Sequence, residues 1–293
     1  MAVYSFLKEA KVYLVQGSTR FPISINNVSF SQTFTEQSYE VKNLHTSDIF
    51  EGSVINTANP ANFSLEVPMF KEAKQKVLFN ALLDYSTFDL YVQTLQDTFK
   101  LEYCVISNGS FSVQKGKNLL FSISGEASKL TRIGNSSYTI PGTANGSIGE
   151  TYLLTQDNSI VLGSENMSEH TLTCVLEFQN DIEWIPYKTL QQVVDNTTMY
   201  PSDFVVTNRI LAGSFSRYIN PETVTDTQTY SQSSSLRIKI GQEIGGTFYG
   251  FDFNMGSCSY TNRINTGSVF TQNYDWRMTD NTTLSNIITY TTT

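Results

Sequence analysis

The stretch VFTQNYDWRM, residues 269–278, follows the same pattern as an earlier stretch, LFSISGEASK, residues 120–129. When one is laid on the other, Phe270 falls on Phe121 and the acidic residues of the two stretches coincide. Both alternate apolar and polar side chains, which is the period of a strand with one buried face. The match predicts that the same strand occurs near the end of each half of the chain.

Other segments repeat at nearly the same separation and in the same order. Three further matches have offsets of 146, 147 and 149 residues: YEVKNLH (39–45) with IPYKTLQ (185–191), FDLYV (88–92) with SLRIK (235–239), and TF (98–99) with TF (247–248). A small drift of this kind is what a few loop insertions produce. The sequence therefore predicts a tandem duplication of one β-rich domain, with a first domain over 1–134, a linker over 135–150 and a second domain over 151–293.

Alternation of apolar and polar residues predicts a mainly β fold. The clearest strand candidates are residues 23–34, 63–67, 88–92, 99–105, 119–123, 171–178, 236–240 and 247–255. Within ISINNVSFSQTF (23–34) the apolar phase changes, which predicts a bulge or turn near Asn26 and Asn27. We expect each domain to be a small β-barrel or β-sandwich.

One segment has the period of a helix. In FKEAKQKVLFNALLD (70–84), Phe70, Ala73, Val77, Ala81 and Leu82 share one face, so a helix is predicted to flank the first sheet. The corresponding segment of the second half, residues 221–235, is polar and predicts at most a single helical turn. Long polar segments follow an early strand in each half, over 38–61 and 184–207, and are predicted to be long inter-strand loops, which are usually functional.

Composition limits the class of protein. The 293 residues carry a net charge of −8, and the acidic excess lies in the second half, since residues 1–146 hold 12 basic and 12 acidic side chains and residues 147–293 hold 7 and 15. An acidic chain is unsuited to binding a nucleic-acid groove. No apolar run approaches the roughly 20 residues of a membrane span, and the charged N-terminal segment predicts a soluble, unexported protein. The three cysteines, far apart in strand-like sequence, are predicted to be reduced core residues.

No catalytic or metal-binding pattern stands out. His45 and His170 are isolated, and the carboxylate pairs Asp181 with Glu183 and Glu165 with Glu169 have spacings that any polar strand supplies. The glycine-rich segments lack the lysine of a phosphate loop. We therefore predict that the chain is not an enzyme and uses no cofactor or metal.

Large apolar residues lie within the two long polar segments. They are Tyr39, Leu44, Phe50, Tyr187, Leu190, Tyr200 and Phe204. Such residues either fold back as a satellite core or anchor a neighbouring subunit, for which aromatic side chains are favoured. Both interpretations remain open on the sequence.

The order of elements in each half resembles the tail tube domain of bacteriophages. An early strand pair, a long segment after YEVK or PYKT, a returning strand, a helix after FSLEVPMF and a closing hairpin that ends in FSISGEAS or FTQNYDW all follow that domain's order. The resemblance implies a structural virion protein whose copies form stacked rings around a channel for the genome. It also implies that the long loops are arms that reach the next ring, so that the seven large residues in them become inter-subunit contacts.

The resemblance also implies partners. Duplicated chains of this family allow a ring trimer with pseudo-sixfold symmetry, while a hexamer remains the other stoichiometry. The partners would be the stacked neighbouring rings, sheath or tube-end proteins and, in transit, DNA. The tail would be assembled in the host cytoplasm.

Two alternative functions are a tube-end ring, such as an initiator, terminator or baseplate ring, and an adhesive carbohydrate-binding β-sandwich. A glycosidase with paired carboxylates is a weaker third.

Overall fold

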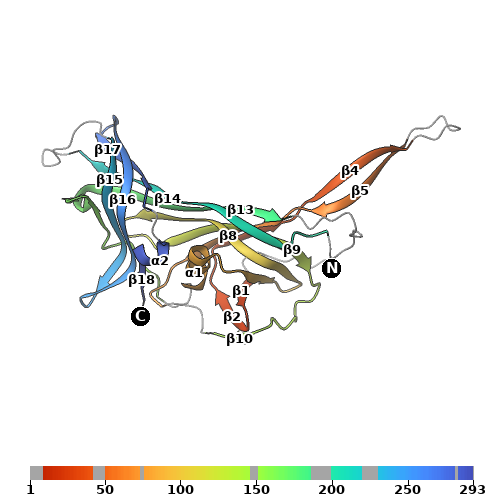
Figure 1. The fold of residues 1–293 in the computed structure, drawn as a ribbon. Helices are drawn as coiled ribbons and strands as arrows, with labels where there is room; N and C mark the ends of the chain where they lie inside the picture. The colour runs from red at the N-terminus through yellow and green to blue at the C-terminus, as the bar shows by residue number, and fades with distance from the viewer. Residues whose placement is uncertain are drawn as a thin grey trace.

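The computed structural model describes residues 9–41, 50–72, 76–145, 151–185, 199–219, 230–280 and 283–292. The fold is mainly β, as predicted, with one 16-stranded sheet and a separate two-stranded hairpin (Figure 1). The first half contains β1 (Lys11–Gln16), β2 (Thr19–Ile23), β3 (Asn27–Ser31), β4 (Phe34–Val41), β5 (Phe50–Ala58), β6 (Ala61–Pro68), α1 (Lys76–Asp84), β7 (Phe88–Gln93), β8 (Thr98–Gln114), β9 (Leu120–Arg132) and β10 (Thr143–Ala144).

The second half contains β11 (Ser159–Leu162), β12 (Glu165–Asn166), the 3-10 turn η3 (Ser168–His170), β13 (Thr171–Ile185), β14 (Asp203–Tyr218), β15 (Tyr230–Ile244), β16 (Thr247–Asn265), β17 (Thr271–Met278), α2 (Leu284–Ile287) and β18 (Ile288–Thr291). The short β10 and β18 pair with β2 and β16 at the margins of the sheet.

The two halves pair their strands in the same order. In the first half the order is β2-β1-β7-β8-β9-β6-β3, and in the second it is β12-β11-β15-β16-β17-β14-β13, with every one of these pairs antiparallel. The register agrees in detail at one edge, since Leu14 faces Leu90 as Leu162 faces Leu236.

The halves are joined edge to edge. The outer part of β8 pairs with β13, from Asn108 opposite Gln179 to Gln114 opposite Thr173. In the strand order of the second half, β13 holds the place that β3 holds in the first half. The joint therefore links the C-terminal part of β8 in the first half to the edge strand β13 of the second half. A continuous sheet results, visible as the long strands that cross the middle of Figure 1.

One hydrophobic core serves both halves. The helix α1 lies under the sheet and inserts Phe79 among aromatic rings of each half. Its ring centroid lies 5.9 Å from that of Phe121 in the first half, and 6.0 and 4.9 Å from those of Phe178 and Phe251 in the second. Burial of such rings is the main stabilising contribution that this fold offers.

The structure corrects two expectations about the first half. The described helix spans Lys76–Asp84, and Phe70 lies in a β-bridge with Tyr152 rather than on the helix. Residues 73–75, which include the predicted helix residue Ala73, lie outside the described part of the chain. The long segment after β3 is not a structureless loop, since β4 and β5 form a hairpin that stands away from the body (Figure 1). The predicted turn near Asn26 and Asn27 is confirmed, because β2 ends before it and β3 begins at Asn27.

Parts of the predicted linker pack on the first half. Ile140 is buried with Val15 and Tyr91, and the Tyr138 ring stacks on Tyr91 with centroids 6.2 Å apart. Residues 146–150 lie outside the described part of the chain. In the second half, residues 220–229, which occupy the place of α1 between β14 and β15, also lie outside it.

Candidate functional site

The sheet has one apolar face and one polar face. Strand alternation turns residues such as Phe63, Phe121 and Phe178 toward the core and leaves the intervening side chains on the other side. One row of directly paired residues crosses eight strands on that side, and it consists of Asn27, Glu66, Ser122, Ser110, Glu177, Ala212, Arg277 and Ser259. All of the side chains in this row are short or polar, so the row itself offers a partner little apolar surface.

Neighbouring rows have the same character. Hydroxyl groups bond across strands at Ser29 with Ser64 (2.8 Å) and at Thr173 with Ser216 (2.7 Å). A hollow of about 490 Å³ opens where β6, β9, β8 and β13 meet, and Ser64, Glu66, Asn108, Glu177 and Gln179 are among its lining residues. No lysine or arginine stands among the described residues that line it. The polar face is therefore weakly acidic at its centre, which disfavours tight contact with phosphate groups.

Each half sends out a hairpin. Strands β4 and β5 extend the β3 and β6 ladder outward, with Gln37 opposite Val54 and Val41 opposite Phe50. The outer parts of β13 and β14 form the second hairpin, which ends at Ile185 opposite Asp203. Figure 1 shows that the β4–β5 hairpin projects furthest from the body. The exposed side chains of Phe34 and Ile55 on it, and of Ile185 and Val205 on the other, give both hairpins apolar surface.

Three of the predicted contact residues, Tyr39, Phe50 and Phe204, lie in the strands of these hairpins. Tyr39 lies in β4 and Phe50 in β5, although the structure does not describe their side chains, and Leu44, Tyr187 and Leu190 lie outside the described residues.

Tyr200 and Phe204 are half-buried within the chain. The Tyr200 ring lies 4.8 Å from Lys129 Nζ and 6.5 Å from the ring of Phe34. Phe204 packs against Trp184 at 5.4 Å and Tyr103 at 5.9 Å. Tyr200 therefore packs beside the first residue of β4, and Phe204 packs near the described end of the β13–β14 hairpin, contacts that no local sequence pattern indicates. A role for all seven residues in subunit contacts stays a prediction.

A clasp between the halves holds the end of α1. Arg209 of β14 donates from Nη2 to the carbonyl oxygens of Leu82 (2.8 Å) and Leu83 (2.6 Å) in the last turn of the helix, and from Nε to Asn180 Oδ1 (3.1 Å). Its guanidinium also lies 4.4 Å from the centre of the Tyr85 ring. A cation at a helix C-terminus satisfies carbonyls that lack helical partners. Desolvation lowers the pKa of Arg209 from its usual value, although a guanidinium remains charged in proteins.

Replacing Arg209 with methionine is expected to reduce the free energy of unfolding by about 2–3 kcal/mol, because hydrogen bonds from a charged donor to buried carbonyls are lost. Urea denaturation of the purified variant would measure this. Arg277→Met, on the exposed polar face, is the matched control and should stay within about 0.5 kcal/mol of the parent. Equal stability of the two variants would show that the clasp contributes nothing.

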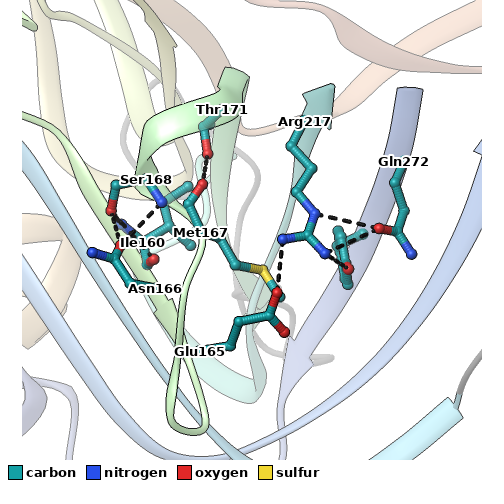
Figure 2. A network of polar contacts seen from close by, with 9 residues as sticks. Ile160, Glu165, Asn166, Met167, Ser168, Thr171, Arg217 and Gln272 are labelled. Carbon is teal, nitrogen blue, oxygen red and sulfur yellow. Dashed lines mark hydrogen bonds and ion pairs between the residues drawn. The ribbon is translucent and has the colours of Figure 1, made fainter. Parts of the chain in front are cut away.

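A second buried arginine has a structural role. Arg217, 1% exposed, donates from Nη1 to Glu165 Oε1 (2.9 Å), from Nη2 to the Tyr274 hydroxyl (2.9 Å) and to Gln272 Oε1 (3.1 Å), as Figure 2 shows. Its partners come from β12 and β17, so the network fixes the β11–β12 hairpin to the sheet. Glu165 thus serves as the ion-pair partner of Arg217.

The cysteines and the Asp181 carboxylate are the remaining groups that the sequence singled out. The three cysteines are free and buried, which confirms the prediction, and burial raises the pKa of Cys174 and of Cys258 to about 12. Asp181 accepts hydrogen bonds from Gln179 (2.7 Å) and Asn208 (3.2 Å) on the exposed sheet. Within the described ranges, no cluster of three metal-ligating side chains occurs, and no helix there has the length and hydropathy of a membrane span.

Comparison with protein families gives one match. The model of the Bacteriophage Baseplate Tube Protein Family matches residues 82–293, which is well over half of the chain and includes all of the second half. No curated protein matches.

Proposed function

The chain belongs to the bacteriophage baseplate tube protein family, and from this premise we propose that its copies close into a ring that forms part of the tail tube at its baseplate end. Membership makes it a structural component of the phage tail or baseplate, which interacts with other tail proteins. The ring, its channel and its stacking are the proposal. The word baseplate in the family's description favours the tube-end alternative over a subunit repeated along the whole tail.

The observation that carries the proposal is the edge-to-edge joint between β8 and β13. It joins two halves that have the same strand order, so the chain already contains one ring-type contact between equivalent units. We propose that the halves arose by duplication, with units 1–134 and 151–293 and the connecting segment 135–150.

A second likeness supports duplication. Phe63 stands directly opposite Gly125 on β6 and β9, and Gly213 stands directly opposite Trp276 on β14 and β17. Each half therefore sets an aromatic ring over a glycine at the same place in its sheet, although the two residues have exchanged strands. Each pair combines one large aromatic ring with one glycine, an arrangement that a close-packed interior can accommodate on either strand.

In the proposal, the ring closes through strand edges that have no partner within the described part of one chain. Among the described strands, β3 pairs with β6 alone, whereas its counterpart β13 pairs with both β14 and β8. In the proposal, β3 of one copy receives the end of β16 from the next copy, as β13 receives β8 within a chain. Repeated head-to-tail contacts of this kind close into a ring when the rotation permits, and closure removes edges that would otherwise favour aggregation. Three chains would then supply six equivalent units.

The polar face suits a channel lining. Its short hydroxyl and amide side chains and its central carboxylates would let a phosphate backbone pass without binding it. The carbohydrate-binding alternative finds less support, because the described lining of the hollow offers no exposed aromatic ring on which a sugar could stack. In the proposal, the β4–β5 and β13–β14 hairpins reach the next ring or a neighbouring tail protein.

Negative-stain electron microscopy and multi-angle light scattering across a concentration series test the ring. We expect hollow rings with a mass three times the chain's 32.9 kDa, and six times that mass would replace the trimer with a hexamer. Particles that stay at the mass of one chain at every concentration, with no ring in the images, would overturn the proposal.

A further inference from the structure

The end of the first half is covered by the segment that follows it in the chain. Residues 151–155 cross the end of β6 and the β8–β9 turn. Leu153 donates its amide to Met69 O (2.9 Å), and Leu119 donates its amide to Leu153 O (2.8 Å). All three side chains are fully buried. Residues 151–155 thus act as an extra short strand that closes this end of the sheet.

The second half builds the same end, but among the described residues no strand covers it. Ile219 donates its amide to Phe270 O (3.1 Å), just as Met69 donates to Leu119 O (2.9 Å). Yet Val269 and Phe270 are each 55% exposed and Tyr218 is 43% exposed. Within the described part of the chain, no segment pairs with Ile219 and Phe270 as Leu153 pairs with Met69 and Leu119. This open end lies at the tips of β14 and β17, at the left of Figure 1.

The sequence contains a counterpart of the covering segment. Val12 faces Val92 as Ile160 faces Ile238, so β1 and β11 are equivalent at a separation of 148 residues. The same separation places VYSFL, residues 3–7, on TYLLT, residues 151–155, with tyrosine on tyrosine. Residues 3–7 are therefore the apolar stretch that corresponds to the covering strand.

We infer that residues 3–7 of one copy pair with Ile219 and Phe270 of the neighbouring copy and cover their exposed side chains. The inference rests on the proposed ring. Within a chain, residues 151–155 lead into the second half, which joins the first half through β13, and they cover the end of the first half. At the proposed joint between copies, the next copy joins through β3 of its first half. Residues 3–7, which lead into that first half, are therefore the ones that would cover the end of the second half. Addition of a short strand supplies backbone hydrogen bonds, and the apolar side chains supply buried area.

Disulfide cross-linking tests the contact. In the first half, Asn118 and Leu154 face each other in a β-bridge, and their counterparts are Val269 and Phe6. The single variants Phe6→Cys and Val269→Cys, one of them carrying a mass tag, should form a covalent dimer of unequal chains when mixed under mild oxidation. The native thiols are buried and do not interfere. Leu95→Cys, 61% exposed elsewhere, replaces Val269→Cys in the matched control and should give no dimer with Phe6→Cys.

Removal of residues 2–8 provides an independent measurement. Strand β1 begins at Lys11, so the shortened chain should fold with an unchanged unfolding midpoint, while its rings dissociate at concentrations about tenfold higher or more. Rings that form equally well without these residues would overturn the inference.

The cross-linking outcomes separate this inference from the ring itself. If wild-type rings form but no mixed dimer appears, the segment does not bind there and only this inference fails. A variant that carries both Phe6→Cys and Val269→Cys gives a further outcome. If it cross-links within one chain while the mixture of the two single variants forms no dimer, residues 3–7 cover their own chain and the proposed contact between copies is wrong. If the wild-type chain forms no rings at all, the proposed function fails, and this inference fails with it.

Discussion

Shortening the β4–β5 hairpin is expected to leave single rings intact and to abolish their stacking. Residues 38–53 would be replaced by Asn-Gly, which joins Gln37 to Val54, two residues that already face each other across the hairpin. A two-residue turn of this type fits an antiparallel ladder. The hairpin pairs with no other described strand and stands away from the core, so thermal unfolding should not change. Electron microscopy would show rings without tubes.

Two comparisons make this result interpretable. A full-length variant with Tyr39→Ser and Phe50→Ser tests whether the apolar side chains, rather than the reach of the hairpin, bring rings together. Tubes of normal length from the shortened chain would refute the role of the hairpin as an arm. Unfolding of the shortened chain would show instead that the hairpin belongs to the core.

Adding one methyl group at Gly213 is expected to destabilise the fold by about 3 kcal/mol or more, at the upper end of overpacking effects. A Cβ atom there would lie 2.1 Å from Val175 O and 2.8 Å from Cζ2 of Trp276. The carbonyl belongs to the adjacent strand and cannot withdraw without breaking the β13–β14 ladder. The midpoint of urea denaturation of Gly213→Ala would fall accordingly.

The chain offers controls for this substitution. At Gly267 the nearest atom to an added Cβ is 3.7 Å away, so Gly267→Ala should be nearly neutral. At Gly125 the added atom would lie 2.2 Å from Val105 O and 2.5 Å from Cζ of Phe63, so Gly125→Ala should be as damaging as Gly213→Ala. A neutral Gly213→Ala would show that the ring does not press on the glycine.

Local alternation was enough to predict most strands, but not their exact correspondence between halves. The sequence sets Phe270 on Phe121 because both are aromatic. Strand pairing instead sets Phe270 in the place of Leu119 and Trp276 in the place of Gly125, a shift of two residues. The reason is physical: the aromatic ring and the glycine have exchanged strands, and a residue-by-residue comparison along the chain cannot follow an exchange between two paired strands.

The features that position the candidate site are harder to predict from the amino-acid sequence than the strands of the main sheet. The sequences of β4 and β5, FTEQSYEV and FEGSVINTA, are largely polar and lack a sustained alternation of apolar and polar residues, so no period of two distinguishes them from a loop. The β8–β13 joint is a pairing between residues 59 to 71 positions apart in sequence, from Gln114 with Thr173 to Asn108 with Gln179, for which nothing local selects a partner. Arg209 is a single cation in a strand of the second half. Its hydrogen bonds to the last carbonyls of α1 form only when the two halves pack together, so its own sequence neighbourhood gives no sign of them.

The shared core also dictates an order of events during synthesis. When the first half leaves the ribosome, Phe79 still lacks Phe178 and Phe251, and the last carbonyls of α1 still lack Arg209. The outer part of β8 likewise has no β13 to pair with. A nascent first half therefore has an unfilled core and an open edge, and it must wait for its own second half to reach the native state. We expect the complete chain to fold before copies associate in the proposed ring, because β13 of the same chain then already occupies the open edge of β8.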